Sequence, residues 1–529
     1  MLTFLFHMSE KETIAALTPE RSLREKCGVV GLYLPSLNRK FQVGIAIKAA
    51  IALWHRGQQG AGIIIKDNDG LRTHHGTGGP EQAFSSIAVD DLNSGETPFW
   101  IIGQTEYGTN GGWNKNNLQP MTAYSKDNHP ITVAHNGQFA RIEEMRDEVG
   151  EPIHDYASDT YIFSRLIAKA QGSSWDEKII STLGKVSGAY SLVIGAEDCL
   201  YLARDPQGIR PLMLGKIGDG LIAVSETDAL DKVGATLIRQ IKRGEIVKIN
   251  KEGVKTIKEG LDGDGNFCDF EWSYFSRPDS SYPLLSQDAE NPEKWKSVYE
   301  FREECGGTLA NEHPIPNASF VIGVPDSGVP VGIGYAGTLG VPYRQLILRD
   351  HYDPDGKGRI FQTDYDKGGI QQRVIGKLSL IPNRKIWKDA IVVIGEDSIV
   401  RGDTSKAITR MVLDAGAKEI HWAVGFPQVN HPCHLGVSMR TYQELISPNN
   451  NEDPKRIAEE IGATSVNYIS YAGFIKARLK TGKDLTMPHN QKEIFLANGG
   501  CGGCLTGLYP VSQEGVIYDS KQAIPLFVR

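Results

Sequence analysis

The sequence predicts an α/β protein in which an α+β domain precedes an α/β domain with a parallel sheet. From Cys27 to about Lys258, short alternating or apolar runs such as FWIIGQTEY and AYSLVIGA are separated by Gly, Pro, Asn and Asp, a pattern typical of packed sheets flanked by helices. Beyond Ser297, wholly apolar runs such as SFVIGVPDSG lead into a glycine-bearing turn and then a helix, as in parallel sheets. The Gly/Asp-rich stretch 259–266 between the two regions predicts a linker.

Within the first region, the runs CGVVGLYL, PITVAHNG, CLYLARD and GEIVKIN are expected strands. Two helix-like stretches interrupt them, near Gly44–His55 and Ser158–Gln171. The pattern of this region therefore predicts sheets with helices packed on them.

Length and composition exclude two classes of partner. A chain of 529 residues predicts two or three domains, and a net charge of −7 gives no basic surface for nucleic acid. No apolar run approaches the roughly 20 residues of a membrane span. The apolar opening Met1–His7 is far shorter than the core of a signal peptide, and Glu10, Glu12 and Glu20 argue against a transit peptide. Seven cysteines without an export signal predict reduced thiols in the cytoplasm.

The second region contains a candidate phosphate site. The expected strand Ala390–Ile394 leads to Glu396 and Asp397, a loop over Ser398–Ser405 follows, and then a helix that Gly416 is expected to end. Carboxyl ends of parallel strands bind ligands, and helix N-termini attract phosphate. Two acids before such a loop fit a sugar that carries a phosphate and a Mg²⁺-complexed diphosphate. An acidic strand end closed by a polar turn explains the same residues.

Cys27 stands directly before a glycine and an apolar run, with 26 residues in front of it. Two interpretations fit this position. The thiol is a small buried group at the edge of a strand, or it is a nucleophile that becomes active once the chain is cut before it.

The motifs together resemble one family. EDSIVRGDTSK resembles the phosphoribosyl pyrophosphate (PRPP) motif of type I phosphoribosyltransferases, and VIGVPDSGVPVGIGYA resembles a companion segment of the amidophosphoribosyltransferase family. The stretches CGVVG, LWHRGQQGAGI, AHNGQ, SDT, ARDPQGIRPL and SETDAL follow that family's order and spacing. The resemblance extends from Cys27 to about Pro510.

The resemblance implies an N-terminal-nucleophile hydrolase αββα sandwich followed by a type I phosphoribosyltransferase domain. The implied parts are a propeptide (1–26), a glutaminase domain (27–262), a phosphoribosyltransferase domain (263–490) and a cluster-binding tail (491–529). The implied reaction converts glutamine, PRPP and water into 5-phosphoribosylamine, glutamate and diphosphate, the first committed step of purine synthesis. A diverged paralogue with another donor or acceptor, or a non-catalytic nucleotide-binding regulator, are the alternatives.

For the glutaminase domain, the resemblance implies that Cys27 is the nucleophile and that its own α-amine is the base. Asn136 and Gly137, in the family's HNG turn, would stabilise the oxyanion. Arg56, Glu106 and Asp159 match glutamine-binding positions. The family has GHxRY where this chain reads GQTEY, so that Gln104 and Glu106 replace a histidine and an arginine. A charged Glu106 about 4 Å from the substrate carboxylate would cost on the order of 4 kcal/mol at an effective dielectric constant of 20.

For the transferase domain, the resemblance implies a Mg²⁺ site at Ser327, Glu396 and Asp397. Asp403 stands where the family has threonine, and as an N-cap it would occupy backbone amides that a phosphate needs. The lid segment is also less basic than in the family, because Asp350, His351, Asp353 and Asp355 dilute its positive charge. The implied PRPP-binding residues are Asp326, Ser327, Glu396, Asp397, Arg401, Gly402, Thr404 and Ser405.

Dispersed cysteines more often hold zinc than any other group. In this chain, however, Cys268, Cys433, Cys501 and Cys504 match the ligands of a structural [4Fe–4S] cluster in the iron–sulfur branch of the family. Cys199 and Cys305 match no ligand position and are expected in cores. Purine nucleotide inhibitors and a homo-oligomer, a dimer or a tetramer, are the remaining implied partners, with neither nucleic acid nor membrane.

Overall fold

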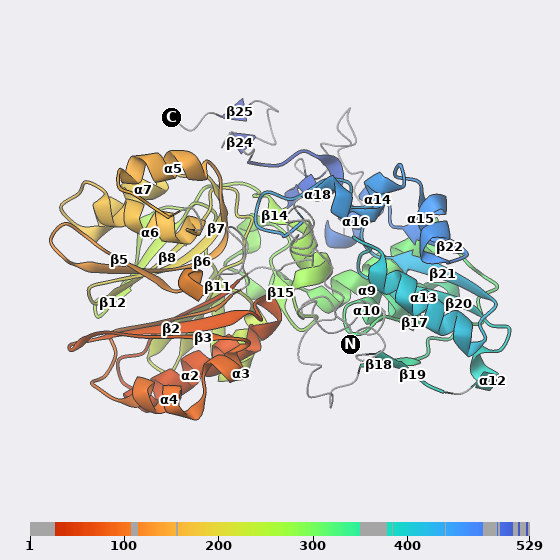
Figure 1. Cartoon of the computed structure of the whole chain (residues 1–529), viewed down its shortest axis with the longest axis horizontal. Coiled ribbons are helices and arrows are strands. Elements are labelled where there is room, and N and C mark those ends of the chain that lie inside the picture. The colour runs from red at the N-terminus through yellow and green to blue at the C-terminus, as the bar shows by residue number, and fades with distance from the viewer. Residues whose placement is uncertain are drawn as a thin grey trace, which may run out of the picture.

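The computed structural model describes residues 27–106, 115–154, 157–349, 378–382, 384–439, 441–479, 495, 498–511, 517–518 and 525–526 (Figure 1). The expected propeptide (1–26), the acidic lid residues from Asp350 to Asp355 and much of the expected tail (491–529) lie outside these residues.

Two antiparallel sheets form the first half of the chain. The seven-stranded sheet has the order β11-β9-β10-β1-β4-β2-β3, and the six-stranded sheet has the order β13-β12-β8-β7-β6-β5. The strands of the first sheet are β1 (Gly28–Tyr33), β2 (Gly60–Asp67), β3 (Gly70–Thr77), β4 (Trp100–Glu106), β9 (Met213–Ile217), β10 (Gly220–Val224) and β11 (Thr236–Gln240). Those of the second are β5 (Met121–Tyr124), β6 (Pro130–Phe139), β7 (Gly188–Ala196), β8 (Cys199–Arg204), β12 (Ile246–Asn250) and β13 (Gly253–Lys258).

The two sheets pack face to face, and helices cover their outer faces (Figure 1). Val29, Trp100 and Ile102 of the first sheet meet Leu200 and Leu202 of the second in a buried core, because alternate residues of each strand point inward. Helices α2 (Arg39–Ala52), α3 (Pro80–Ala83), α4 (Ser86–Asn93) and α8 (Thr227–Val233) lie on one side, and α5 (Ile142–Val149), α6 (Asp159–Lys169) and α7 (Trp175–Leu183) lie on the other. This confirms the αββα sandwich.

The two helices expected from the sequence are present with shifted ends. The first begins earlier, at Arg39, because Asn38 caps it by accepting the N–H of Phe41, and it ends at Ala52 before a 3₁₀ turn over Trp54–Arg56. The second begins at Asp159, after Ser158 accepts the N–H of Tyr161.

A parallel sheet forms the second half, with the order β17-β20-β21-β22. Alternate residues of its strands divide between two cores, with α9 and α10 packed on one face and α13 and α15 on the other. The strands are β17 (Phe320–Gly323), β20 (Ile391–Glu396), β21 (Glu419–Val424) and β22 (Ser465–Tyr468), and the helices are α9 (Val298–Glu312), α10 (Gly328–Leu339), α12 (Arg384–Trp387), α13 (Asp403–Ala415), α14 (Ile446–Asn449), α15 (Pro454–Ile461) and α16 (Tyr471–Leu479). This confirms the phosphoribosyltransferase-type parallel sheet.

The expected loop over Ser398–Ser405 is shorter than the sequence suggested. Helix α13 already begins at Asp403, because Gly402 takes a left-handed conformation with φ of +83° that turns the chain into the helix. Gly416, with φ of +117°, ends the helix as expected.

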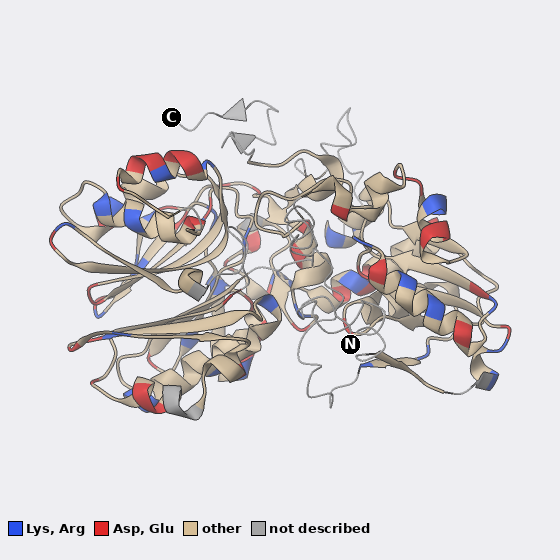
Figure 2. Cartoon of the chain, in the orientation of Figure 1, with Lys and Arg blue, Asp and Glu red and all other residues tan. Residues whose placement is uncertain are grey.

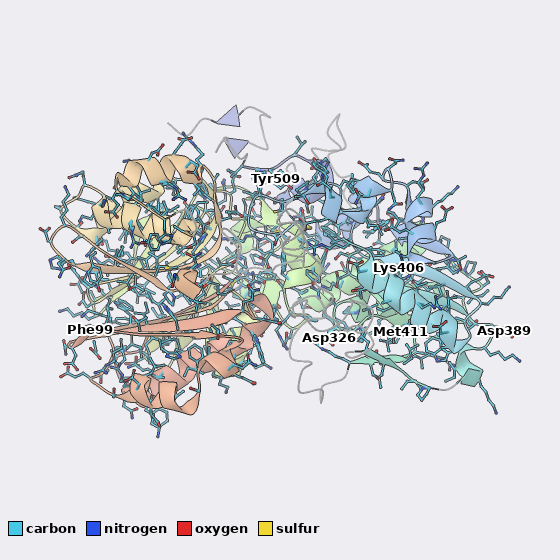
Figure 3. The ribbon with its side chains drawn as sticks, viewed as in Figure 1. Phe99, Asp326, Asp389, Lys406, Met411 and Tyr509 are labelled. Carbon is cyan, nitrogen blue, oxygen red and sulfur yellow. The ribbon has the colours of Figure 1, made fainter. Side chains whose placement is uncertain are left out.

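Short elements join the two halves. After stretch 259–266, β14 (Phe267–Cys268) pairs in parallel with β23 (Gly500–Cys501), and a helical turn spans Glu271–Phe275. Tyr509 in the same C-terminal segment lies close to this joint (Figure 3). The other short elements are β15 (Ser281–Tyr282), β16 (Lys296–Ser297), β18 (Ile347–Arg349), β19 (Leu378–Leu380), α18 (Gly503–Thr506), β24 (Ile517–Tyr518) and β25 (Pro525–Leu526).

Charged side chains of both signs alternate over the outer helices, without a broad basic face in the view of Figure 2. Among the described helices, none is both long enough and apolar enough to cross a membrane.

We predict that Gly334→Ala destabilises the protein, because α9 and α10 touch at this position. A Cβ atom on Gly334 would lie 1.9 Å from the carbonyl oxygen of Glu303, whereas one on Gly337, in the same helix, meets nothing within 4 Å. Overpacking at Gly334 should lower the free energy of unfolding by about 1–3 kcal/mol. Gly337→Ala should raise it by up to about 1 kcal/mol through helix propensity. Urea unfolding of both variants checks this, and equal effects would contradict the close approach.

Candidate active sites

Cys27 lies at the open end of the sandwich. It precedes β1, whose antiparallel pairing with β4 begins at Gly28 and Thr105, so Cys27 and Glu106 each lie one residue beyond this pair. Cys27 shares the side of its strand with Val29, which belongs to the core between the sheets. The thiol residue is 6% exposed. The nucleophile candidate therefore sits at the rim of the inter-sheet space.

Asn136 and Gly137 reach the same end from the second sheet. The sequence placed them in a turn, but both lie inside β6, whose backbone is distorted at Gly137 by a φ of +143°. A Cβ on Gly137 would lie 1.9 Å from the carbonyl oxygen of Ala189, so only glycine fits there. The amide of Asn136 is fully buried, and neither its oxygen nor its nitrogen has a hydrogen-bond partner among the described residues. Such an amide is ready for a ligand.

Two carboxyl groups lie beside these residues. Asp159 begins α6, and its oxygens accept the N–H groups of Thr160 at 2.8 Å and Phe139 at 3.1 Å. Glu106 accepts the N–H of Gln119 at 2.7 Å. Burial raises the pKa of Glu106 to about 8, the Gln119 N–H opposes the shift, and the negative charge of Asp159 adds to it. The full charge on Glu106 assumed from the sequence is therefore wrong near pH 7.

Gln104 has a structural task. Its amide donates to the carbonyl oxygen of His135 at 2.9 Å and accepts the N–H of the same residue at 3.3 Å. These two bonds join β4 of one sheet to β6 of the other. Gln104 thus holds together the end of the sandwich where Cys27 and Asn136 lie.

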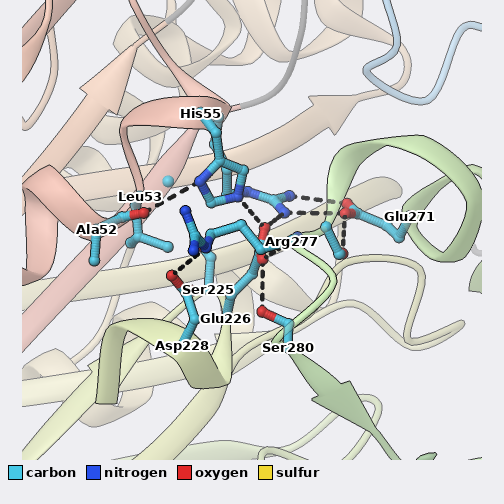
Figure 4. A network of polar contacts seen from close by, with 12 residues as sticks. Ala52, Leu53, His55, Ser225, Glu226, Asp228, Glu271, Arg277 and Ser280 are labelled. Atoms are coloured by element: carbon cyan, nitrogen blue, oxygen red, sulfur yellow. Dashed lines mark hydrogen bonds and ion pairs between the residues drawn. The ribbon is translucent and has the colours of Figure 1, made fainter. Parts of the chain in front are cut away.

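Arg56 is held in a buried network of ion pairs. Figure 4 labels its carboxylate partners Glu226 and Glu271. Its guanidinium contacts Glu226 and makes two hydrogen bonds to Glu271, at 2.9 and 3.0 Å, and its Nε donates to the carbonyl oxygen of Cys27 at 3.4 Å. The side chains of Arg56, Glu226 and Glu271 are fully buried. The cation expected to line a glutamine pocket therefore already has two carboxylate partners, and it also holds the backbone of Cys27.

Glu226 gathers the rest of this network. His55 lies 2.8 Å from Oε1, while the backbone N–H of Arg277 and the hydroxyl of Ser280 donate to Oε2 at 3.0 and 2.8 Å. Burial alone would raise the pKa of Glu226, but His55, Arg56 and these hydrogen bonds lower it. Arg277 also pairs with Asp228 at 3.1 Å. Sequence reasoning missed Glu226 and Glu271, although SETDAL and FEWSYF placed an acid within apolar surroundings.

A cavity of about 670 Å³ lies between the two halves. His55 and Arg277 of the network line one wall, and the ends of β17 and β20 with the start of α13 line the other. Asp326 marks the transferase side in Figure 3. All the expected PRPP-binding residues line this one cavity: Asp326, Ser327, Glu396, Asp397, Arg401, Gly402, Thr404 and Ser405.

Hydroxyl and carboxyl groups lie close together where β20 ends at the cavity. Ser327 donates to one oxygen of Asp397, and Ser398 donates to the other at 2.6 Å. Burial and the Asp397 charge raise the pKa of Glu396 well above its usual value. Such a set of hard oxygen donors with excess negative charge fits Mg²⁺.

The phosphate-loop side chains are placed at the start of α13. Thr404 Oγ1 is buried without a hydrogen-bond partner among the described residues, and Arg401 pairs with Glu444. Gly402 is the N-cap, and Asp403 is an exposed residue of the first turn. The prediction that Asp403 caps the helix is therefore wrong.

Four thiols converge near the joint. β14 and β23 place Cys268 beside Cys501, and Cys504 follows in α18. Burial raises the pKa of all four, and for Cys433, Cys501 and Cys504 the neighbouring thiols raise it further. Within the described parts of the chain, no group of three or more His, Cys, Asp or Glu side chains is arranged to hold a metal ion.

Comparisons with known proteins cover both halves. The family model of the glutamine amidotransferase domain matches residues 113–232. The amidophosphoribosyltransferase of Bacillus subtilis is 32% identical, with 95% of this chain and 98% of that protein covered. The amidophosphoribosyltransferase of Methanothermobacter thermautotrophicus is 34% identical, with 93% of this chain and 96% of that protein covered. The chloroplastic amidophosphoribosyltransferase 1 of Arabidopsis thaliana is 37% identical, with 93% of this chain and 80% of that protein covered.

Two solved structures are similar over nearly the whole chain. The glutamine PRPP amidotransferase of B. subtilis, complexed with ADP and GMP, matches with a TM-score of 0.77 at 31% identity and covers 93% of this chain and 99% of that one. A structure described as the allosteric regulatory enzyme of purine biosynthesis matches with a TM-score of 0.76 at 31% identity, covering 94% and 99%.

We predict that Arg56→Met costs about 3–5 kcal/mol of unfolding free energy at pH 8, because it strands two buried carboxylates. Without the cation, burial should raise the folded-state pKa of Glu226 above the unfolded value. The contribution of Glu226 is then retained at low pH and lost as pH rises, so the defect should shrink at pH 5. Arg410→Met is the control, because Arg410 is 69% exposed and, among the described residues, its ion pair is with Asp414 in the same helix. Urea unfolding at both pH values decides, and a larger defect at pH 5 would contradict the argument.

Proposed function

This chain belongs to the amidophosphoribosyltransferase family, and we propose that it releases ammonia from glutamine in the sandwich and transfers it to PRPP in the interdomain cavity. The overall reaction converts glutamine, PRPP and water into glutamate, 5-phosphoribosylamine and diphosphate. The observation that carries the proposal is the single cavity in which all eight expected PRPP-binding residues meet a wall built by His55 and Arg277. No observation favours a paralogue with another donor or a non-catalytic regulator.

In the first step, the Cys27 thiolate attacks the side-chain amide of glutamine. The amide of Asn136 and the N–H of Gly137 receive the developing oxyanion, ammonia leaves, and water hydrolyses the resulting thioester to glutamate. The α-amine of Cys27 is the base, with an ordinary pKa of about 7.7–8.0, which requires removal of residues 1–26. Arg56 positions Cys27 through its carbonyl oxygen.

In the second step, ammonia displaces diphosphate from the ribose carbon. The start of α13, with Arg401, Gly402, Thr404 and Ser405, receives the ribose phosphate through backbone amides and hydroxyls. Ser327, Glu396 and Asp397 would hold Mg²⁺, which neutralises the diphosphate when it is bound. Asp326 lines the same wall.

The four thiols would hold a [4Fe–4S] cluster. The thiols influence one another's pKa, so they lie near one another, and this proximity supports one group bound by all four. A cubane is wider than a single ion, so its ligands stand further apart than those around one zinc ion. The group would tie the C-terminal segment to β14. Purine nucleotides as inhibitors, a homo-oligomer and a cytoplasmic location complete the proposal.

We predict that Cys27→Ala lowers glutamine-dependent phosphoribosylamine synthesis by about 1000-fold or more, while synthesis from free ammonia continues at its normal rate. Parallel assays with glutamine and with ammonia measure this, and Cys199→Ala is the control because Cys199 is a buried thiol beside Asp198. The self-base mechanism also requires that active protein begin at Cys27 by intact mass. Glutamine-dependent activity retained by Cys27→Ala would refute the nucleophile.

We predict about four irons per chain after anaerobic purification. Cys504→Ser should lose the iron and lower the thermal unfolding midpoint, because ligand binding contributes to folding in such sites. Cys199→Ser should retain both. Elemental analysis and calorimetry provide the readouts, and stoichiometric zinc without iron would overturn the cluster.

A further inference from the structure

We propose that Gly436 is a positioning residue for amide hydrolysis, because the loop 433–437 of the second half rests on Gly137 and holds this part of β6 in place for the oxyanion. The inference rests on the proposed function and adds to its first step a residue from the other half of the chain. It makes the first site depend on how a loop of the second half is seated.

The backbones of Gly436 and Gly137 are in direct contact. A Cβ atom on Gly436 would lie 3.1 Å from the carbonyl carbon of Gly137 and 3.2 Å from its carbonyl oxygen. Gly436 is buried and has a φ of +101°, a conformation that favours glycine. The loop therefore meets β6 with bare backbone, and a side chain at this position would press on Gly137.

Strand β7 also confines Gly137. In the register of β6 and β7, Gly137 pairs with Tyr190, and a Cβ atom on Gly137 would lie 1.9 Å from the carbonyl oxygen of Ala189. Interiors packed this closely transmit a displacement instead of absorbing it in empty space. A shift of the loop is therefore passed on to Gly137.

Arg210 fastens the loop to the sandwich at this point. Its Nη2 donates to the carbonyl oxygen of Leu435 in the loop. Its own carbonyl oxygen accepts the hydroxyl of Ser191 at 3.2 Å, and Ser191 pairs with Asn136 in the register of β6 and β7. Arg210 therefore connects the loop to the strand beside the two expected oxyanion residues.

The C-terminal segment holds the loop from the other side. Immediately before the loop, the backbone N–H groups of Asn430 and His431 donate to the carbonyl oxygen of Cys504, at 2.9 Å each. The hydroxyl of Tyr509 donates to the carbonyl oxygen of Pro432. The second half thus presents the loop to β6 as a fixed surface.

A small displacement of Gly137 matters because the oxyanion forms only as the amide is attacked. Effective donors lie about 2.7–3.1 Å from the oxyanion, and the loss of one donor lowers kcat by about 100–1000-fold. A shifted donor weakens the same interaction without removing it. Interactions made only in the transition state affect kcat and leave the binding of the substrate unchanged. A fault in positioning should therefore appear in kcat and not in KM.

The experiment compares Gly436→Ala with the wild type in the mature enzyme. The methyl group presses on Gly137, so kcat with glutamine should fall at least about tenfold, while KM for glutamine changes less than about threefold. Synthesis from free ammonia should continue at its normal rate. Gly253→Ala is the matched control, because Gly253 has a φ of +114° and a Cβ there meets nothing within 4 Å. It imposes similar backbone strain without the contact and should keep the wild-type kcat.

Arg210→Lys tests the same link without an added methyl group. Lysine keeps a positive charge beside Glu271, but it lacks the second nitrogen that holds the carbonyl oxygen of Leu435. This variant should show the same combination of lower kcat and retained KM. Wild-type kinetics in both variants, a change in KM alone, or loss of ammonia-dependent synthesis in both would overturn the positioning role.

Hydrogen exchange separates this inference from the proposed function. If the wild type makes no product from glutamine, the proposed first step fails, and amide exchange in β6 (Pro130–Phe139), followed by mass spectrometry, then carries the test. Gly436→Ala should speed exchange in this strand by about fivefold or more, because the displaced strand opens more often. Gly253→Ala should leave the exchange unchanged. Equal exchange in the wild type and Gly436→Ala would overturn the inference.

Discussion

The arrangement of both halves depends on the ion pairs of the fully buried Arg56 guanidinium. It binds Glu226 of the sandwich, Glu271 of the joint and the backbone of Cys27 at once. A buried charge without its partners costs several kcal/mol, so none of these three segments is stable in its place unless the others are formed. The position of Cys27 is thereby tied to the chain segment that leads into the second half of the chain.

Glu271 extends the same constraint in a second direction. It also pairs with Arg210 at 3.3 Å, and Arg210 donates to the carbonyl oxygen of Leu435. The next residue, Gly436, packs so closely on Gly137 that a Cβ there would lie 3.1 Å from its carbonyl carbon. The loop that carries Cys433 therefore rests on Gly137, the glycine next to Asn136 in β6. The loop with Cys433 and the strand with Gly137 are therefore in direct contact.

Much of the fold could be predicted from the sequence, because strands, helices and motifs are marked by residues that are close together in the chain. Alternation of apolar residues marked both sandwich sheets, and the motif around Glu396 and Asp397 marked the cavity. Long-range pairing was not predictable: no local pattern says that Arg56 meets acids 170 and 215 residues away. The charge state of Glu106 depends on burial, which a motif does not report. Asp403 was misplaced by one residue, because the left-handed Gly402 is the N-cap and decides where α13 begins.

The pairing of β14 with β23 has a consequence for the chain as it is synthesised. Cys268 meets Cys501 only after about 230 further residues have been translated, which takes about 10–50 seconds at ordinary rates of elongation. All sandwich strands precede this point, so that half can form at the ribosome while its seam with the transferase half stays open. During that interval Cys268 and the apolar residues around it lack their C-terminal cover. The seam is therefore the last part of the joint to close.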